Sequence, residues 1–495
     1  MRKFYNAFWD RNPALFVGLS ILLGASLAFN FHYLFIILFI LLSLTAKSKR
    51  MLCFSALCFC SAFCMAYFRN PTTVIPEKQK GIGTFHIEQV KNYSSPFHKS
   101  ILYKGTLKQF ETENGIIFKK LPCNIYFPQY GKRPPADTDY KIQGTLSQKG
   151  EHAFVLKPEK NSIWIPIPTH FSLSEWRYAA KQTVSSYLKK HIADPRARTF
   201  LCALATGEID ERILSLEFGK IGLQHILAIS GFHFALAALF LNFLFRLFFP
   251  HTISAIFFIV AISCYYLFLG NAPSIQRAYI AILLFAIGQL FSLKISGLNA
   301  LGAGLIIELL IDPLVVTELS FQFTFLCTLA ILLFYPLANH ALMPLFPARS
   351  YSDTQSMSLL DKHGCLFSAL LRKMLALNLA VHIISIPVIL YLFHKFPLLS
   401  FGYNLIFPAC VTLSMLLLFV ALFFAPFIPF LSHAIHVINN AWTSTILNFS
   451  TNPPAFLDFA IRTKSIELTW VLCFLAAAFF SGIIFYEKER QRTIA

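Results

Sequence analysis

The sequence predicts a polytopic α-helical membrane protein of about eleven spans, with a small extracytoplasmic β-barrel domain inserted near the N-terminus. Three observations lead to this prediction. Of the 495 residues, 56% are hydrophobic and only 13% are charged. The apolar residues come in blocks, and one long polar stretch, 77–165, has the alternation of strands. Such a composition excludes an ordinary soluble globule.

The apolar blocks are the predicted membrane spans, because a hydrocarbon core about 30 Å thick needs about 20 apolar residues per helix. A half-polar segment, 430–449, is predicted to be an interfacial or re-entrant helix. The N-terminal spans fall within 1–70 and a channel-type domain within 221–486. The blocks lie near 14–29, 31–46, 51–68, 222–249, 252–270, 273–292, 297–311, 319–338, 374–394, 400–425 and 467–486.

Positive charge predicts the orientation. Three basic clusters lie before the first block, after the second and in the tail 487–495 (Arg2, Lys3, Arg11; Lys47, Lys49, Arg50; Lys488, Arg490, Arg492). With these clusters in the cytoplasm, both termini are cytoplasmic and the segment after residue 70 lies outside. The apolar N-terminus has no clear cleavage site, so we expect an uncleaved first helix of a bacterial inner-membrane protein.

The polar stretch 77–165 predicts five short strands at 84–91, 100–110, 115–127, 139–147 and 151–157, separated by Gly, Pro, Asn and Ser. Asn114-Gly115 is a strong hairpin signal. Five strands in under a hundred residues favour a small barrel, with the OB fold as leading candidate. The following segment, 171–220, predicts an amphipathic interfacial helix that begins near Ser174, with Trp176 and Tyr187 at the interface.

The predicted barrel is basic, with about 14 Lys and Arg against 8 Asp and Glu. A basic groove with stacking aromatic rings is how OB domains hold single strands. Alternatively, most of the aromatic residues are barrel core and the lysines form a solvated face. The candidate contacts near predicted loops are Tyr93, Phe97, Lys99, Tyr130, Lys132 and Arg133.

The segment Gly222-Leu-Gln-His-Ile-Leu-Ala-Ile-Ser-Gly-Phe-His233 places polar side chains at membrane depth. On a helix, Gly222, His225, Ser230 and His233 fall within an arc of about 140°, and Gly231 permits a break or a close approach of another backbone. Three interpretations stay open: polar contacts between packed helices, a pore lining, or a Ser-His nucleophile. The rhomboid pattern Gly-x-Ser-Gly is only half met, because Ala228 takes the first position.

Other polar groups at membrane depth indicate a wet interior. Arg277 requires a partner in a low dielectric, and Glu308 and Glu318 are the candidates. The chain has no GxxxxGK[ST] loop and no HxHxDH-type cluster, which argues against ATP hydrolysis by a P-loop and against a metal-dependent nuclease. Its cysteines form no CxxC pair. We therefore expect no cofactor, no metal and no enzymatic activity. The groups that open neighbouring blocks are Asn271, Ser274, Gln276, Arg277, Ser320, Gln322 and Thr324.

The chain resembles the ComEC family of competence proteins, the inner-membrane channels for transforming DNA. The resemblance is carried by the 222–233 segment and by a series of shorter motifs in order and spacing over roughly 10–485. These are Ala272-Pro-Ser-Ile-Gln-Arg-Ala278, Asp312-Pro313, Leu319-Ser-Phe-Gln-Phe-Thr-Phe325, Ser385-Ile-Pro-Val-Ile-Leu-Tyr-Leu-Phe393 leading to Asn404 and Pro408, and the stretch Asp139–Leu146.

The resemblance implies an extracytoplasmic OB domain and helices that line a path for single-stranded DNA. It makes His225, Ser230, Gly231, His233, Ser274 and Arg277 candidates for that path, to which Gln276 and Gln322 are added from their positions. Many members end in a metallo-β-lactamase-like domain, whereas this chain stops at Ala495. We therefore expect a separate nuclease if a strand is degraded.

The expected partners are single-stranded DNA, membrane lipids, a DNA receptor or pilus proteins outside, and a cytoplasmic ATPase or helicase. Two other functions remain open. One is a transporter of another anionic or lipid-linked solute, with the OB-like domain as a recognition module. The other is an intramembrane serine hydrolase.

Overall fold

The computed structural model describes most of the chain. The described residues are 2–69, 78–94, 99–128, 133–136, 138–149, 154–159, 163–167, 173–208, 212–223, 226, 231–270, 272–347, 349, 355, 357–451 and 459–494.

Nine helices in the described residues are long and apolar enough to cross a membrane. They coincide with nine of the eleven predicted blocks, and the other two blocks form the shorter helices α3 (Leu34–Leu44) and α12 (Gly297–Ile311). The chain is a multi-pass membrane protein. The nine helices are α2 (Pro13–Asn30), α4 (Lys49–Arg69), α9 (Gly231–Phe248), α10 (His251–Leu269), α11 (Pro273–Leu290), α13 (Leu319–Ala341), α15 (Leu359–Phe393), α16 (Leu399–Phe424) and α18 (Leu468–Ile494).

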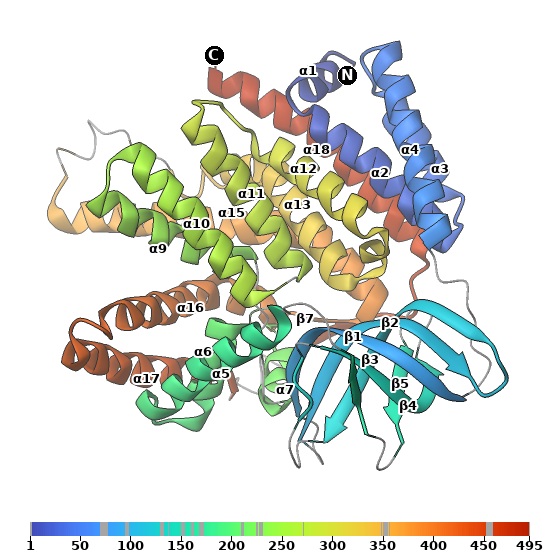
Figure 1. The fold of residues 1–495 in the computed structure, drawn as a ribbon. Coiled ribbons are helices and arrows are strands. Elements are labelled where there is room, and N and C mark those ends of the chain that lie inside the picture. Colours follow the sequence, from blue (N-terminus) through green and yellow to red (C-terminus); the bar gives the residue numbers. More distant parts are fainter. Residues whose placement is uncertain are drawn as a thin grey trace.

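Glycines allow the N-terminal helices to pack closely. A Cβ atom on Gly302 of α12 would lie 2.2 Å from the backbone nitrogen of Leu15 in α2. A Cβ on Gly24 of α2 would lie 2.3 Å from the carbonyl oxygen of Phe59 in α4. Small residues at such crossings bring helix backbones together, which is how helices associate where lipid offers no hydrophobic driving force. The short helix α1 (Arg2–Arg11) joins this group through an ion pair between Arg11 and Glu487 of α18, and both termini lie at the same end of the molecule (Figure 1).

The half-polar segment predicted at 430–449 is helix α17 (Pro429–Thr451), which packs against α16. Two of its polar side chains, Asn439 and Thr443, face that neighbour. The Asn439 amide donates to the carbonyl oxygen of Ser414 at 3.0 Å, and the hydroxyl oxygens of Thr443 and Ser414 lie 3.1 Å apart. These bonds satisfy polar groups that are fully buried, so the helix does not need water along this face.

The β domain confirms the five predicted strands and adds a sixth, beside one end of the helical region (Figure 1). Asn114 and Gly115 lie in the β2–β3 turn, where Gly115 has a φ of +77°. The short β6 follows the predicted set and pairs with β4. The strands are β1 (Gln79–Ser94), β2 (Lys99–Thr112), β3 (Ile117–Pro128), β4 (Asp139–Gln148), β5 (Phe154–Pro158) and β6 (Ile165–Ile167).

Strand pairing links β1 to β5 in a continuous order. β1 pairs with β2, β2 with β3, β3 with β5, β5 with β4, and β4 with β1. The β3–β5 pairing is parallel and the others are antiparallel. Phe85, Tyr103 and Phe118 are buried in the core of this domain, as the alternative interpretation of its aromatic residues expects, whereas Tyr93 and Tyr126 are exposed.

Three helices follow the β domain: α5 (Leu173–His191), α6 (Pro195–Thr206) and α7 (Arg212–Lys220). Asp194 caps α6, because its side chain accepts a hydrogen bond from the Arg196 N–H at 2.9 Å. Two short strands pair antiparallel: β7 (Lys395–Pro397), which follows α15 in the chain, and β8 (Ala460–Arg462), which precedes α18. The 3₁₀ helix η1 (Pro313–Thr317) joins α12 to α13.

Candidate functional site

The predicted helical arc does not include Gly222. Gly222 lies in a turn with a φ of +74°, and α9 begins only at Gly231. The turn is fixed by a close approach, since a Cβ on Gly222 would lie 2.6 Å from the Cβ of Ser400 in α16. Gln224, His225 and Ser230 lie outside the described residues, so the predicted helical arc and the Ser-His pair have no described geometry.

Gly231 permits the start of α9 to touch the start of α11. A Cβ at this position would lie 2.9 Å from Nη2 of Arg277 and 3.4 Å from the carbonyl oxygen of Ser274. Pro273 opens α11 at a position where its missing N–H costs nothing. The close approach expected of Gly231 is therefore present, and it joins two motifs that lie forty residues apart in the sequence.

The Arg277 side chain also joins a third motif, because it reaches α13. Its Nη1 donates to the carbonyl oxygen of Thr324 at 2.6 Å and to the hydroxyl of Thr328, and the guanidinium lies 5.7 Å from the centre of the Phe325 ring. Backbone and hydroxyl oxygens thus take the place of the predicted carboxylate partner. In the described part of the chain, Arg277 forms no ion pair.

Glu308 on α12 is nevertheless the carboxylate that acts electrostatically on Arg277. It is 2% exposed, and a Cβ on Gly304, one turn before it, would lie 3.6 Å from Cγ of Arg277. Among the described residues, neither carboxylate oxygen of Glu308 has a hydrogen-bond partner, and neither does Nε of Arg277. Buried polar atoms without partners are costly, and ordered water is the usual remedy.

The other predicted path residues differ in their surroundings. His233 is buried at 3% exposure, and Ser274 and Gln276 are half-buried near the start of α11. The Gln322 amide donates to the carbonyl oxygen of Val316 at 2.8 Å, which ties α13 to η1. Glu318 is exposed at the start of α13. Gly231, Ser274 and Arg277 are therefore brought together, while Gln322 and Glu318 lie at the beginning of the helix that Arg277 reaches.

The predicted contacts in the β domain are only partly described. Tyr93 is 39% exposed and its ring centre lies 5.2 Å from that of Tyr126 on β3. Lys99 begins β2, opposite Ser94. Phe97, Tyr130 and Lys132 lie outside the described residues.

Arg133 holds α5 against the β domain. Its Nη1 donates to Oε2 of Glu175 at 2.9 Å, and its guanidinium lies 4.2 Å from the centre of the Tyr178 ring. Burial alone raises the pKa of Glu175, but hydrogen bonds from Arg133 and from the Ala136 N–H outweigh it and lower that pKa. The carboxylate is therefore ionised and anchored at neutral pH.

Two cations of α5 that the sequence analysis did not single out cap the end of α10. Nε of Arg177 donates to the carbonyl oxygen of Leu267 at 2.8 Å, and Nζ of Lys181 donates to that of Leu269 at 3.0 Å. Cations are favourable at helix C-termini because the last carbonyls lack partners and carry partial negative charge. Their i,i+4 spacing is visible in the sequence, but the helix end that they contact depends on tertiary packing.

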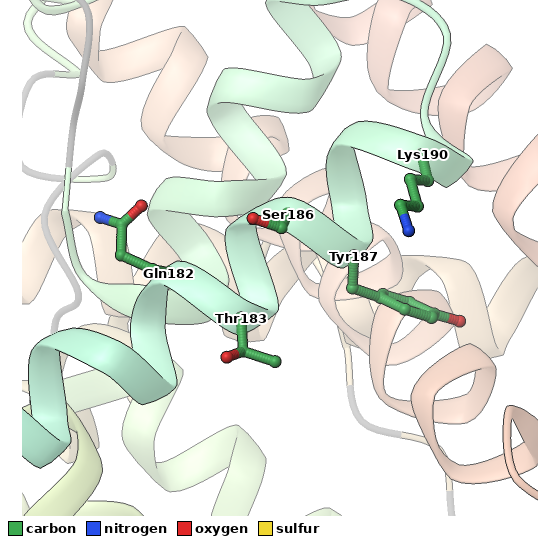
Figure 2. A pocket seen from close by; sticks show the side chains of 5 residues that line it. All are labelled: Gln182, Thr183, Ser186, Tyr187 and Lys190. Carbon is green, nitrogen blue, oxygen red and sulfur yellow. The ribbon is translucent and has the colours of Figure 1, made fainter.

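A cleft of about 410 Å³ runs along α5, and it is lined by Gln182, Thr183, Ser186, Tyr187 and Lys190 (Figure 2). The Tyr187 hydroxyl lies 3.3 Å from Nε2 of His436 on α17. None of the predicted path residues that the structure describes lines this cleft, so it is not the site formed around Arg277.

Comparison with known proteins agrees with the motifs. The competence protein family matches residues 205–488, which is more than half of the chain and includes every helix from α9 to α17. The chain is also 25% identical over 231 residues to ComE operon protein 3 of Bacillus subtilis (strain 168). That match covers 44% of this chain and 26% of the relative, so the chain spans about a quarter of the relative's length. No solved structure matches. The resemblance inferred from the motifs is confirmed, and the chain belongs to the competence protein family.

Proposed function

We propose that this chain conducts single-stranded DNA across the bacterial inner membrane during natural transformation. The membership in the competence protein family supports a role in DNA uptake. In this proposal the termini are cytoplasmic and the β domain is an OB-like barrel that captures DNA outside. The ring-like pairing order of its strands, with β3 parallel to β5, supports that fold.

The observation that carries the proposed path is the convergence of three motif segments on Arg277. A Cβ on Gly231 of α9 would lie against the Arg277 guanidinium and the carbonyl oxygen of Ser274, which is one turn before Arg277 on α11. Nη1 of Arg277 donates to the carbonyl oxygen of Thr324 on α13. The unpartnered atoms of Arg277 and Glu308 favour water at this place rather than dry packing. We propose that the path is lined by Gly231, His233, Ser274, Gln276, Arg277 and Gln322, with His225 and Ser230 just before α9.

The chain supplies no catalysis in this proposal. Transport relies on a cytoplasmic ATPase or helicase, delivery on a DNA receptor or pilus proteins, and any strand degradation on a separate nuclease. In the β domain, we propose contacts by Tyr93, Phe97, Lys99, Tyr130 and Lys132. Arg133, the sixth candidate, acts instead by holding α5 in place.

Substitution of Arg277 tests the path. We expect Arg277→Met to lower uptake of labelled DNA roughly tenfold or more, because a hydrogen bond from a charged group is worth about 1.5–3 kcal/mol. Arg277→Lys, which keeps the charge, should recover part of the uptake. The readouts are internalised label and transformant frequency at matched protein level.

The matched control is Arg246→Met, since Arg246 is an exposed arginine on α9 that bonds Gln289. Its uptake should equal that of the wild type. Normal uptake by Arg277→Met at normal protein level would contradict a path through this site.

A further inference from the structure

Helix α5 lies between the β domain and the membrane helices. On one side, the Ser174 hydroxyl donates to the carbonyl oxygens of Ile87 and Glu88 in β1, at 3.1 and 2.6 Å. One turn later, Tyr178 donates to the side-chain oxygen of Asn92 at 3.3 Å. The end of β1 therefore runs along the same helix whose Arg177 and Lys181 cap α10. Strand β1, helix α5 and the end of α10 meet here.

Four cationic side chains gather at this meeting point: Lys91 on β1, Lys104 on β2, and Arg177 and Lys181 on α5. We name them the junction cluster. Lys91 is repelled by the other three and attracted by Glu208, which follows α6. Glu208 is already the partner of Lys181, with Nζ and Oε1 3.1 Å apart. Four positive charges face two carboxylates, Glu208 beside Lys181 and Glu318 near Lys104 at the edge of the cluster, so positive charge is in surplus.

Lys91 is the member that lacks an anion. It is half-buried, and within the described part of the chain its ammonium group has no hydrogen bond or ion pair. Burial, and then repulsion by Lys104, Lys181 and Arg177 against the attraction of Glu208, lowers the pKa of Lys91 to about 8. An anion bound beside Lys91 would reverse this penalty, because opposite charge stabilises the protonated form.

The neighbouring side chains favour a nucleic-acid strand as the source of that anion. Tyr93 lies two residues after Lys91, so both side chains are on the same face of β1. Tyr93 and Tyr126 are exposed and in ring contact. A cation for phosphate next to aromatic rings for bases is the arrangement that binds single strands without sequence preference. A lipid headgroup would use the cations but not the rings.

We propose that the junction cluster binds a backbone phosphodiester of single-stranded DNA as the strand passes from the β domain to the membrane helices. This inference rests on the proposed function and deepens it, since it gives the strand a defined phosphate site between capture and entry. Lys91 supplies the unpaired charge, while Arg177 and Lys181 fix the helix that holds the cluster in place.

The experiment measures binding of a fluorescent oligothymidine to the full chain in phosphatidylcholine nanodiscs, across salt concentration and pH. We expect Lys91→Met to weaken binding about tenfold at neutral pH and low salt. It should also reduce the slope of log K against log salt by about 0.7, the value for one lost phosphate contact on a single strand. Lys119→Met, which removes an exposed lysine near the β2–β3 turn, is the control and should bind nearly as the wild type.

The pH profile separates a phosphate contact from a structural role. Wild-type affinity should fall as the pH rises above about 8, because unbound Lys91 loses its proton near its pKa of about 8 while a bound phosphate keeps Lys91 protonated to higher pH. Lys91→Arg should abolish this fall, since a guanidinium stays charged. The other groups facing Lys91 are Lys104, Arg177, Lys181 and Glu208. Lys91→Met should be no less stable than the wild type, because it removes a repelled charge.

Three results would overturn the proposal, and they are distinguishable. Equal binding by Lys91→Met and Lys119→Met would remove the junction site and leave DNA capture intact. Absence of salt-dependent binding by the wild type would remove capture and the junction site together. If phosphatidylglycerol in the nanodiscs eliminates the difference between the wild type and Lys91→Met, the site belongs to a lipid headgroup.

Discussion

The centre of the proposed path depends on a balance of charge between Arg277 and Glu308, which are not hydrogen-bonded to each other. Arg277 donates hydrogen bonds to oxygens of α13. Glu308 is buried on α12, and in the described structure its carboxylate oxygens have no hydrogen-bond partner. Each charge still acts on the other. Removing one partner of a buried pair leaves an uncompensated charge, which typically costs about 3–5 kcal/mol.

A double-mutant cycle tests this balance. We expect Glu308→Met and Arg277→Met each to lower the thermal stability of the purified protein, and the double variant to be less unstable than the sum of the two. The coupling should be about 1–3 kcal/mol, the range for residues that share a network. Glu487→Gln, on α18, is the control and should be additive with Arg277→Met. Additivity of Glu308→Met with Arg277→Met would contradict the balance.

The hydrogen-bond partners of Arg277 are a part of the site that the sequence could not predict. The polar character of Arg277 at membrane depth is visible in the sequence, and its role in a path stays a prediction. Its partner was predicted as a carboxylate because charge pairing is the simplest solution. The structure instead supplies a backbone carbonyl and a threonine hydroxyl, and nothing local to Thr324 or Thr328 marks them as partners.

Helix α5 is the element that connects the β domain to the membrane helices. Arg133 and Glu175 fix its first turn to the β domain, and Arg177 and Lys181 fix the next turns to α10. The sequence predicted an amphipathic interfacial helix here, and its polar face holds two domains together. This connecting role of α5 could not be predicted, because its contacts involve residues far apart in the chain.

Hydrogen exchange tests the role of α5. We expect Glu175→Gln to increase exchange of the first turns of α5 about tenfold, because it removes a charge-assisted bidentate pair worth about 1.5–3 kcal/mol. Exchange of α17 should not change. Glu217→Gln is the matched control, since Glu217 forms an ion pair with Arg196 near α6 and α7. Equal exchange of α5 in both variants would contradict the docking role.

Elements differ in how well local sequence defines them. Nine of the eleven predicted spans coincide with long apolar helices in the described residues, because a run of about 20 apolar residues is a local property. The start of α9 was misplaced because the apolar run continues through 222–230, while the turn at Gly222 is set by contact with Ser400. Strand β6 was missed because three residues around Pro166 carry little periodic signal.

At the scale of the whole molecule, three segments far apart in sequence meet at Arg277, and the β domain is attached nearby through α5. Family membership supports a role in DNA uptake. In the proposed function, DNA is captured by the β domain, passes the junction cluster, and then enters between the starts of α9, α11 and α13. The central claim is that a strand in transit touches the start of α11.

Photocrosslinking during uptake tests this claim most directly. A photoreactive amino acid replaces Gln276, which is half-buried beside Arg277, or Phe285, which is 42% exposed on the same helix. Cells are irradiated while labelled DNA is being taken up, and crosslinked protein is measured. We expect crosslinks to single-stranded DNA at position 276 and none above background at position 285. Equal crosslinking at both positions, or none at 276 while uptake continues, would contradict it.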